Sequence, residues 1–302
     1  MLKGYKAILR GELDNDAIFA HIFEPDVDDE EGDPETWRKV QPHLGVTVYE
    51  DFYKSEYQKA LYSADDALEF RTKLLNIFAS NSATTWIEAK QIEERFKKVQ
   101  IENITSKPPT MVGVDLSVRD DFSTVTYNLY SVDSRSFHSY TDYYFPDGAL
   151  EKHPNCELYK GWVKAGYLKL CKGDIIDYQQ IVDDILKMAN YLCIMGIGYD
   201  PYKSAEFVNL LSSSVGGEAD IINPVKQTYG TFTSPVESFE IAIYSNKISF
   251  DPNPITPYCF ANAVLDEDRN CNRKPIKKTH NAKIDSTITN LMTFHLFNNL
   301  TS

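Results

Sequence analysis

The strongest constraint on the fold is a change of sequence pattern at residue 111. From there on, short apolar and β-rich runs follow one another and then alternate with amphipathic helices. Residues 111–118 are apolar enough for a buried central strand, and two more β-rich runs, 124–132 and 137–145, follow after short turns. This order predicts three consecutive antiparallel strands within a mixed α/β fold.

A second buried strand is predicted over residues 194–199. The segment before it places four apolar side chains on one helical face: Ile181, Ile185, Met188 and Leu192. A helix between two strands forms a crossover that sets the second strand parallel to the first and beside it. Further helices are predicted over residues 204–212, 236–246 and 284–297. We therefore expect a central sheet of five or more strands flanked by helices.

The beginning of the chain has a different character. Apolar spacing and acidic first turns predict helices over residues 51–61, 65–78 and 86–99. The polar stretch 102–109, which contains two adjacent prolines, ends this helical region. We therefore predict two domains, a mainly helical one over residues 1–106 and the mixed α/β domain over residues 107–302.

Composition excludes several classes of protein. With 302 residues, of which 42% are hydrophobic, the chain can bury a sizeable core. It has no run near the roughly 20 apolar residues that span a bilayer, and its first residues lack the apolar core of a signal peptide, so a cytoplasmic location without membrane contact is expected. The five cysteines show no C-x-x-C spacing, which predicts reduced, mostly buried thiols.

The formal net charge of -13 argues against tight binding of nucleic acid through phosphate contacts alone. The acidic run 26–35 is expected to be an exposed loop. One basic segment gathers Arg273, Lys274, Lys277, Lys278 and Lys283. A charge run of this kind is usually a solvated loop, so it supports contact with nucleic acid only beside other observations.

Three aspartates stand where predicted elements begin or end. Asp115 lies in the first apolar strand, on the face opposite its apolar neighbours, where an uncompensated ionised carboxylate is costly. Asp200 follows the second strand, at the carboxyl edge where open α/β sheets place ligands. Asp285 opens the last helix. If the two strands are neighbours and the helix packs across them, the three carboxylates converge.

Each aspartate also has an ordinary structural interpretation. Asp200 before Pro201 suits a turn, Asp285 suits a helix cap, and backbone donors or Arg119 could satisfy Asp115. The order strand Asp, strand-end Asp, helix Asp is more specific than any one of them. Close carboxylates repel one another, and hard Mg²⁺ or Mn²⁺ ions relieve that repulsion. Two such ions about 4 Å apart activate a water and stabilise the leaving oxygen, which predicts hydrolysis of a nucleic-acid backbone.

At these residues the sequence resembles the large terminase subunit of tailed phages and prophages, whose C-terminal nuclease has an RNase H-like fold. GVDLSVRDDFSTVT resembles the first nuclease motif of that family, YDPYKSAEF the second, and NPITPYCFANAV through KKTHNAKIDSTITNL the third with its lead-in. IFAHIFEPDVDDEEGDPETWRKVQPHLGVTV and LLNIFASNSATTWI resemble the segment between the family's ATPase core and its nuclease, so the resemblance covers nearly the whole chain. Ser286 departs from the family, which usually has a small residue such as glycine there.

The resemblance implies a metal-dependent endonuclease that cuts concatemeric double-stranded phage DNA during genome packaging, with the small terminase subunit and the portal protein as partners. It implies Asp115, Asp200 and Asp285 as ligands of Mg²⁺ or Mn²⁺, with two ions expected, and Asp121 as a candidate for the outer coordination shell. The implied candidates for contact with the DNA backbone are Lys203, Lys277, Lys278 and Lys283.

One element of the family is missing. Nothing in the sequence matches G-x-x-x-x-G-K-[ST], the phosphate-binding loop of the packaging ATPase. Residues 1–106 are therefore expected to be the final part of the ATPase region, in a truncated chain or a split or decayed gene.

Two other interpretations stay open. A DDE-type transposase or integrase uses the same three-carboxylate fold for strand transfer, although the terminase-like first region and the Asp in place of a helix Glu disfavour it. A non-catalytic docking piece of a packaging motor would keep the fold without cutting DNA.

Overall fold

The computed structural model of the protein describes residues 8–9, 18–26, 28–77, 85–119, 121–202, 204–279 and 282–301. The chain divides into two compact units, Met1–Ser82 and Ala83–Ser302. Residues 85–106 contribute to the larger unit, since Thr85 bridges to Val264 and Phe96 to Phe250. The domain boundary that the sequence suggests at residue 106 stays a prediction.

The smaller unit is helical in its described part. Its elements are α2 (Pro34–Val40), α3 (Glu50–Ala60), α4 (Ala64–Glu69) and the π-helical turn η1 (Phe70–Leu74). They enclose a small aromatic core around Trp37, Tyr53 and Phe70. In its described residues the acidic run remains a loop as far as Asp33, whose carboxylate caps α2 by accepting a hydrogen bond from the amide of Glu35 at 2.9 Å. The helices predicted over residues 51–61 and 65–78 are confirmed, the second as far as Leu74.

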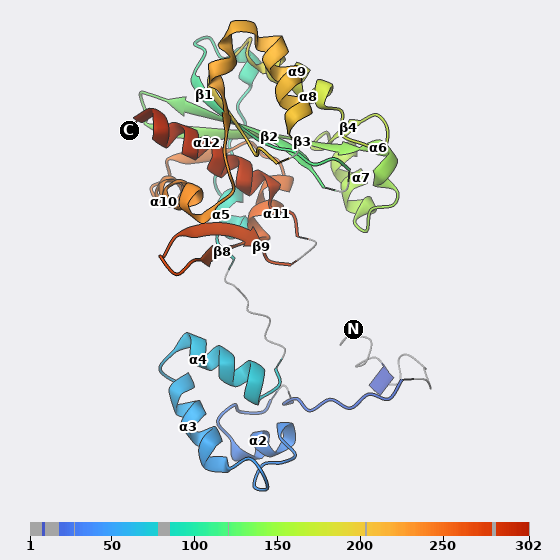
Figure 1. Ribbon diagram of the computed structural model, residues 1–302, viewed down its shortest axis with the longest axis vertical. Helices are drawn as coiled ribbons and strands as arrows, with labels where there is room; N and C mark the ends of the chain where they lie inside the picture. The colour runs from blue at the N-terminus through green and yellow to red at the C-terminus, as the bar shows by residue number, and fades with distance from the viewer. Residues whose placement is uncertain are drawn as a thin grey trace. The chain divides into compact units, whose positions relative to one another are not determined.

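The larger unit alternates strands and helices (Figure 1). Its strands are β1 (Pro109–Asp115), β2 (Ser123–Ser131), β3 (Ser136–Pro146), β4 (Lys169–Cys171), β5 (Cys193–Tyr199), β6 (Ile222–Pro224), β7 (Ile248–Phe250), β8 (Ala263–Glu267) and β9 (Arg273–Lys277). Its helices are α5 (Ala89–Glu93), η2 (Ile101–Asn103), α6 (Asp147–Leu150), α7 (Cys156–Lys164), α8 (Tyr178–Met188), α9 (Ala205–Val215), η3 (Gly216–Ile221), α10 (Tyr229–Tyr244), α11 (Ile255–Ala261) and α12 (Asp285–Thr301).

The main sheet has the strand order β4-β3-β2-β1-β5-β6, with β7 beside β3. Strands β1, β2 and β3 are successive antiparallel neighbours, and β5 runs parallel to β1 after the α8 crossover. The predicted strand order and the parallel placement of β5 are confirmed. Strands β8 and β9 form a separate antiparallel hairpin.

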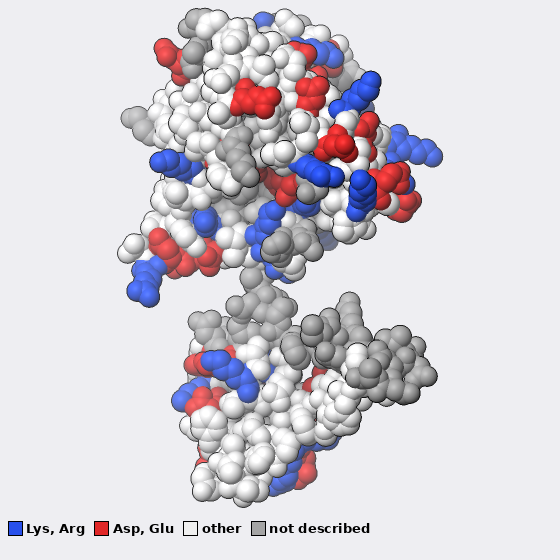
Figure 2. All heavy atoms as spheres, turned by 45° about the vertical axis from the view of Figure 1, so that its right-hand side comes forward, with Lys and Arg blue, Asp and Glu red and all other residues white. Residues whose placement is uncertain are grey.

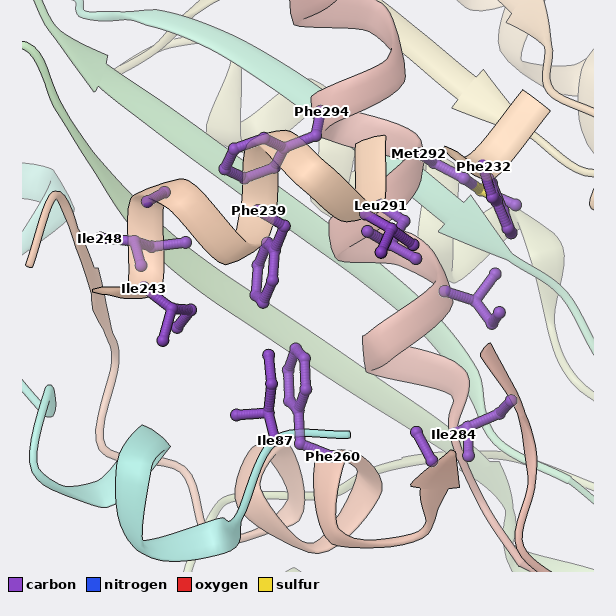
Figure 3. Packing of buried hydrophobic residues seen from close by; sticks show 14 of the residues in the cluster. Ile87, Phe232, Phe239, Ile243, Ile248, Phe260, Ile284, Leu291, Met292 and Phe294 are labelled. Atoms are coloured by element: carbon purple, nitrogen blue, oxygen red, sulfur yellow. The ribbon is translucent and has the colours of Figure 1, made fainter. Parts of the chain in front are cut away.

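Helices cover both faces of the sheet (Figure 1). On one face, Val112 and Val114 of β1 are buried with apolar residues of α8 and α9, such as Ile181 and Phe207. On the other face, Met111 belongs to a cluster with residues of α10, α11 and α12. Figure 3 shows this second cluster, in which Phe239 of α10 lies among Phe294, Leu291 and Phe260. Alternate residues of β1 therefore enter two different cores, as a central strand requires.

Helix α12 packs on the sheet through polar as well as apolar side chains. Thr289 shares a hydrogen bond of 2.6 Å with Thr126, and Asn128 donates to Thr293 at 3.0 Å. The side chain of Asn290 accepts from Ser139 at 2.8 Å. These bonds join one helix to β2 and β3 and satisfy polar groups that would otherwise be buried without partners. They fix the register of α12 on the sheet.

Two sequence predictions are wrong. The helix expected over residues 86–99 is only α5, because Trp86 donates its amide to Ala263 and Lys97 donates to Phe250, which holds the flanking backbone extended. The thiols are free in the described residues, but Cys193 and Cys271 are exposed and only Cys171 and Cys259 are buried. Tertiary pairing overrides helix propensity in the first case.

No helix in the described ranges is both long and apolar enough to cross a membrane.

Candidate active site

The three predicted aspartates lie at one edge of the sheet. Asp115 is the last residue of β1, and Asp200 directly follows β5. The two strands are parallel neighbours, with Val114 opposite Tyr199, so their carboxyl ends share an edge. Asp285 is the first residue of α12, which crosses β1. The sheet topology and the last helix thus bring together residues that are far apart in the sequence.

Asp115 is held in a site that disfavours its charge. Burial raises the pKa of Asp115 to about 7, and the negative charges of Asp200 and Asp121 act in the same direction. Lys277 and a long hydrogen bond of 3.5 Å from the amide nitrogen of Gln227 oppose this rise. The upward shift of this pKa indicates a carboxylate that lacks enough positive charge around it.

Asp285 is more deeply buried, with 6% of its surface exposed. Burial raises the pKa of Asp285 well above its usual value, and the charges of Asp121 and Asp115 add to this effect. Its Oδ2 atom has no hydrogen-bond partner among the described residues. A buried carboxylate oxygen without a donor is costly, and a cation is one of the groups that would compensate it.

Asp200 also fulfils the ordinary role that its position suggests. Its Oδ1 atom accepts a hydrogen bond of 2.9 Å from the amide of Tyr202, as a turn aspartate does. The charge of Asp200 nevertheless contributes to the raised pKa of Asp115. The turn therefore aims this carboxylate close enough to Asp115 for the two charges to interact.

Asp121, in the loop between β1 and β2, lies between two lysines. Its Oδ1 atom is 2.8 Å from the Nζ atom of Lys283, and its Oδ2 atom is 3.0 Å from that of Lys277. Lys283 is only 8% exposed, which is unusual for a lysine, and Asp121 supplies a counter-ion to its buried ammonium. The loop between β1 and β2 is thereby tied to the end of β9 and to the residues that lead into α12.

The lysines predicted to contact DNA have different environments. Lys283 is buried, whereas Lys277 is exposed, and both are paired with Asp121. Lys278 is exposed, with its Nζ atom 3.4 Å from the hydroxyl of Thr85. Lys203 lies outside the described residues.

The chemistry of the site suits a hard divalent cation. Its donors are carboxylate oxygens, they repel one another, and one of them is buried without a partner. However, within the described ranges no group of three or more acidic, histidine or cysteine side chains is arranged so that it could hold a metal ion. The site therefore has the right donors, but they are not gathered around one point.

No sequence pattern indicated the role of Gln227, which lies between β6 and α10 and donates to Asp115. The ion pairs of Lys283 and Lys277 with Asp121 were equally absent from any pattern. A glutamine in a loop carries no local signal of such a role. The ion pairs join segments more than 150 residues apart, since the separation of Lys277 and Asp121 is 156 residues.

Comparison with known proteins identifies the family. Residues 12–299 match the family model described as "Terminase large subunit, endonuclease domain". The chain is 28% identical over 303 residues to Protein YmfN of Escherichia coli strain K12, an alignment that covers 94% of this chain and 64% of YmfN.

Two solved structures are similar to this chain. The crystal structure of the HK97 bacteriophage large terminase matches with a TM-score of 0.62 and 20% identity, over 96% of this chain and 59% of that chain. The large terminase nuclease from thermophilic phage G20c, crystallised with bound magnesium, matches with a TM-score of 0.45 and 7% identity over 72% of this chain and 97% of that chain.

The chain spans less than two thirds of the first two proteins that it matches, 64% of YmfN and 59% of the HK97 large terminase. The predicted RNase H-like fold, a mixed sheet flanked by helices, is confirmed by the likeness to the HK97 structure. The resemblance inferred from the sequence motifs is also confirmed, because the family model covers almost the whole chain. The chain belongs to the family of terminase large subunit endonuclease domains.

Proposed function

We propose that this protein is a metal-dependent endonuclease that cuts concatemeric double-stranded phage DNA during packaging. Asp115, Asp200 and Asp285 would bind two Mg²⁺ or Mn²⁺ ions. The observation that carries the proposal is the electrostatic link between the three aspartates: the charge of Asp200 helps to raise the pKa of Asp115, and the charge of Asp115 helps to raise that of the buried Asp285. Family membership over residues 12–299 supports it.

Burial and repulsion make these carboxylates selective for a cation. Divalent ions would replace the missing positive charge and would favour the ionised form of Asp115 and Asp285. When bound, two such ions activate a water for attack on a phosphodiester and stabilise the leaving oxygen. Because the described carboxylates do not form a ready group of three, the proposal requires their side chains to move toward a shared ion.

The surrounding residues would keep the carboxylates in position. Gln227 donates to Asp115 and restrains the rotation of its carboxylate. Asp121 neutralises Lys283, which stands two residues before Asp285, and so anchors the start of α12 to the loop after β1. We therefore assign Asp121 a positioning role behind the metal ligands.

Contact with DNA would depend on few positive charges. Figure 2 shows acidic and basic side chains interspersed on one face of the larger unit, without a continuous basic patch in that view. Lys278 is the best placed of the described lysine candidates because it is exposed beside the paired Lys277. Lys203, Lys277 and Lys283 remain candidates. The small terminase subunit and the portal protein are the partners that we propose from the family.

Plasmid cleavage tests the proposal. Supercoiled plasmid incubated with the protein and Mn²⁺ should be nicked and linearised, and EDTA should abolish the reaction. Asp115→Asn should lose activity at least about a hundredfold, because one ligand of the proposed ions is removed. Asp51→Asn is the matched control, since Asp51 is highly exposed on α3 in the other unit.

The outcomes separate the alternative functions. Absence of metal-dependent nicking by the folded wild-type protein would contradict the nuclease proposal and favour a docking role in a packaging motor. Joining of a supplied DNA end to the plasmid would favour a transposase or integrase.

A further inference from the structure

A cavity of about 450 Å³ opens at the end of the sheet remote from the aspartates. Its lining includes Pro109, the first residue of β1, and Ser131, the last residue of the antiparallel strand β2. Asp115 ends β1 six residues further on, which corresponds to about 20 Å along a strand. The cavity is therefore separate from the proposed metal site.

The lining combines apolar and positively charged residues. Its apolar members include Val99, Pro108 and Leu129, and five serines also line the cavity: Ser106, Ser131, Ser134, Ser136 and Ser249. Lys97 and Lys107 line the cavity against a single carboxylate, that of Asp133. A third cation is close, since the Nζ atom of Lys247 is 3.0 Å from the carbonyl oxygen of Ser134 in the same wall. This local positive excess contrasts with the net charge of -13.

His138 supplies a second, independent observation. It lines the cavity, is only 9% exposed, and its Nε2 atom has no hydrogen-bond partner in the described part of the chain. Its Nδ1 atom lies 2.9 Å from the hydroxyl of Ser249, which is itself 3.4 Å from the carbonyl oxygen of Phe137. Either partner can be the donor in the bond between Ser249 and Nδ1, and in both cases Nε2 is the unused atom of the ring.

The charge of Lys97 also acts on this ring. Burial, and then the charge of Lys97, lower the pKa of His138 to about 4. An anion bound near Lys97 would offset its charge and favour the protonated ring, which could then donate a hydrogen bond from Nε2.

We propose that this cavity binds a phosphate ester of nucleotide size. Lys97 would meet the phosphate group, Lys107, whose Nζ atom donates to the carbonyl oxygen of Ala189 at 3.0 Å, would add positive charge beside it, and the apolar residues around Leu129 would contact the rest of the ligand. The volume lies within the range of about 300–1,000 Å³ that is typical of small-molecule sites and far exceeds a bare phosphate. Lysine is a common phosphate-binding residue, and serine hydroxyls can donate to the same oxygens. The phosphate ester could be a free nucleotide or part of a DNA strand, and both share this chemistry.

Calorimetric titration of the full chain in EDTA tests the proposal without divalent ions at the carboxylates. The probes are thymidine 5′-monophosphate, the single-stranded oligonucleotide of four thymidylates, and thymidine itself. Lys97→Glu should weaken phosphate-ester binding at least about tenfold, because a charge-assisted hydrogen bond is lost. Lys98→Glu makes the same charge change at an exposed neighbour that does not line the cavity, and it should leave affinity unchanged.

Each outcome decides the proposal. Binding of the mononucleotide identifies a free nucleotide as a ligand, whereas binding of the oligonucleotide alone identifies a DNA strand as the ligand. Either result supports the site if Lys97→Glu weakens the binding and Lys98→Glu does not. A shift of the His138 ring signals in NMR spectra, assigned with His138→Gln, should accompany binding. The proposal is overturned if neither phosphate ester binds, if thymidine binds equally well, or if the two lysine variants have equal effects.

Discussion

A Cβ atom on Gly113 of β1 would lie 2.2 Å from the carbonyl oxygen of Thr289 in α12. The strand and the helix therefore touch backbone to backbone at this point, and only glycine fits. Asp115 is two residues along the strand, and Asp285 is one helical turn before Thr289. The close approach therefore sets the distance between the two carboxylates on which the proposed metal site depends.

Gly113→Ala should destabilise the larger unit by about 3 kcal/mol, because α12 has to move away from the sheet to accommodate the methyl group. Urea unfolding followed by circular dichroism measures the change. Gly161→Ala in α7 is the matched control, since a Cβ atom added at Gly161 would have nothing within 4 Å and alanine favours a helix. Equal stability of the two variants would show that the contact does not constrain α12.

Asp121→Asn should destabilise the protein by roughly 2 kcal/mol, because the buried ammonium of Lys283 loses its ion pair with this carboxylate. We take a value below that of fully buried pairs because the Asp121 side chain is 28% exposed. The double variant Asp121→Asn/Lys283→Met removes both charges and should recover part of the lost stability in the same unfolding assay. Failure of the second substitution to recover any stability would argue against the loss of the Asp121–Lys283 ion pair as the cause.

His138 should make stability depend on pH. Its pKa in the folded protein is about 4, below the ordinary value of 6.5, so the unfolded chain binds the proton more readily. The contribution of His138 is therefore lost as pH falls from about 6.5 to about 4, with a slope of up to about 1.4 kcal/mol per pH unit. The free energy of unfolding of the wild type, measured relative to that of His138→Gln, should therefore decrease as pH falls between these values. Parallel curves would contradict the assigned shift.

Much of the fold was predictable because its signals are local. The apolar run of β1, the amphipathic face of α8 and the start of α12 at Asp285 are all visible in the sequence. The shared edge of β1 and β5 followed from one topological rule, the parallel placement of a strand after a crossover. Thus the placement of Asp115 and Asp200 at one edge could be foreseen from pattern, whereas that of Asp285 depended on how the last helix packs.

The remaining features depend on contacts between distant segments. The shortened helix α5 results from pairing with Ala263 and Phe250, which no local pattern reveals. The burial of Lys283 was equally hidden, since its sequence context is that of a solvated basic loop. The position of its partner Asp121 between two lysines was also hidden, while the role in the outer coordination shell that the resemblance implies for Asp121 stays a prediction. Tertiary packing determines all three.

A titration of the full chain with Mn²⁺ tests the central claim most directly, with electron paramagnetic resonance measuring the concentration of the free ion. We predict that the wild type binds two ions and that Asp115→Asn and Asp285→Asn each weaken binding at least about tenfold, while Asp51→Asn has no effect. Absence of Mn²⁺ binding by the folded protein, or binding that neither site substitution alters, would contradict a shared cation site at the edge of the sheet.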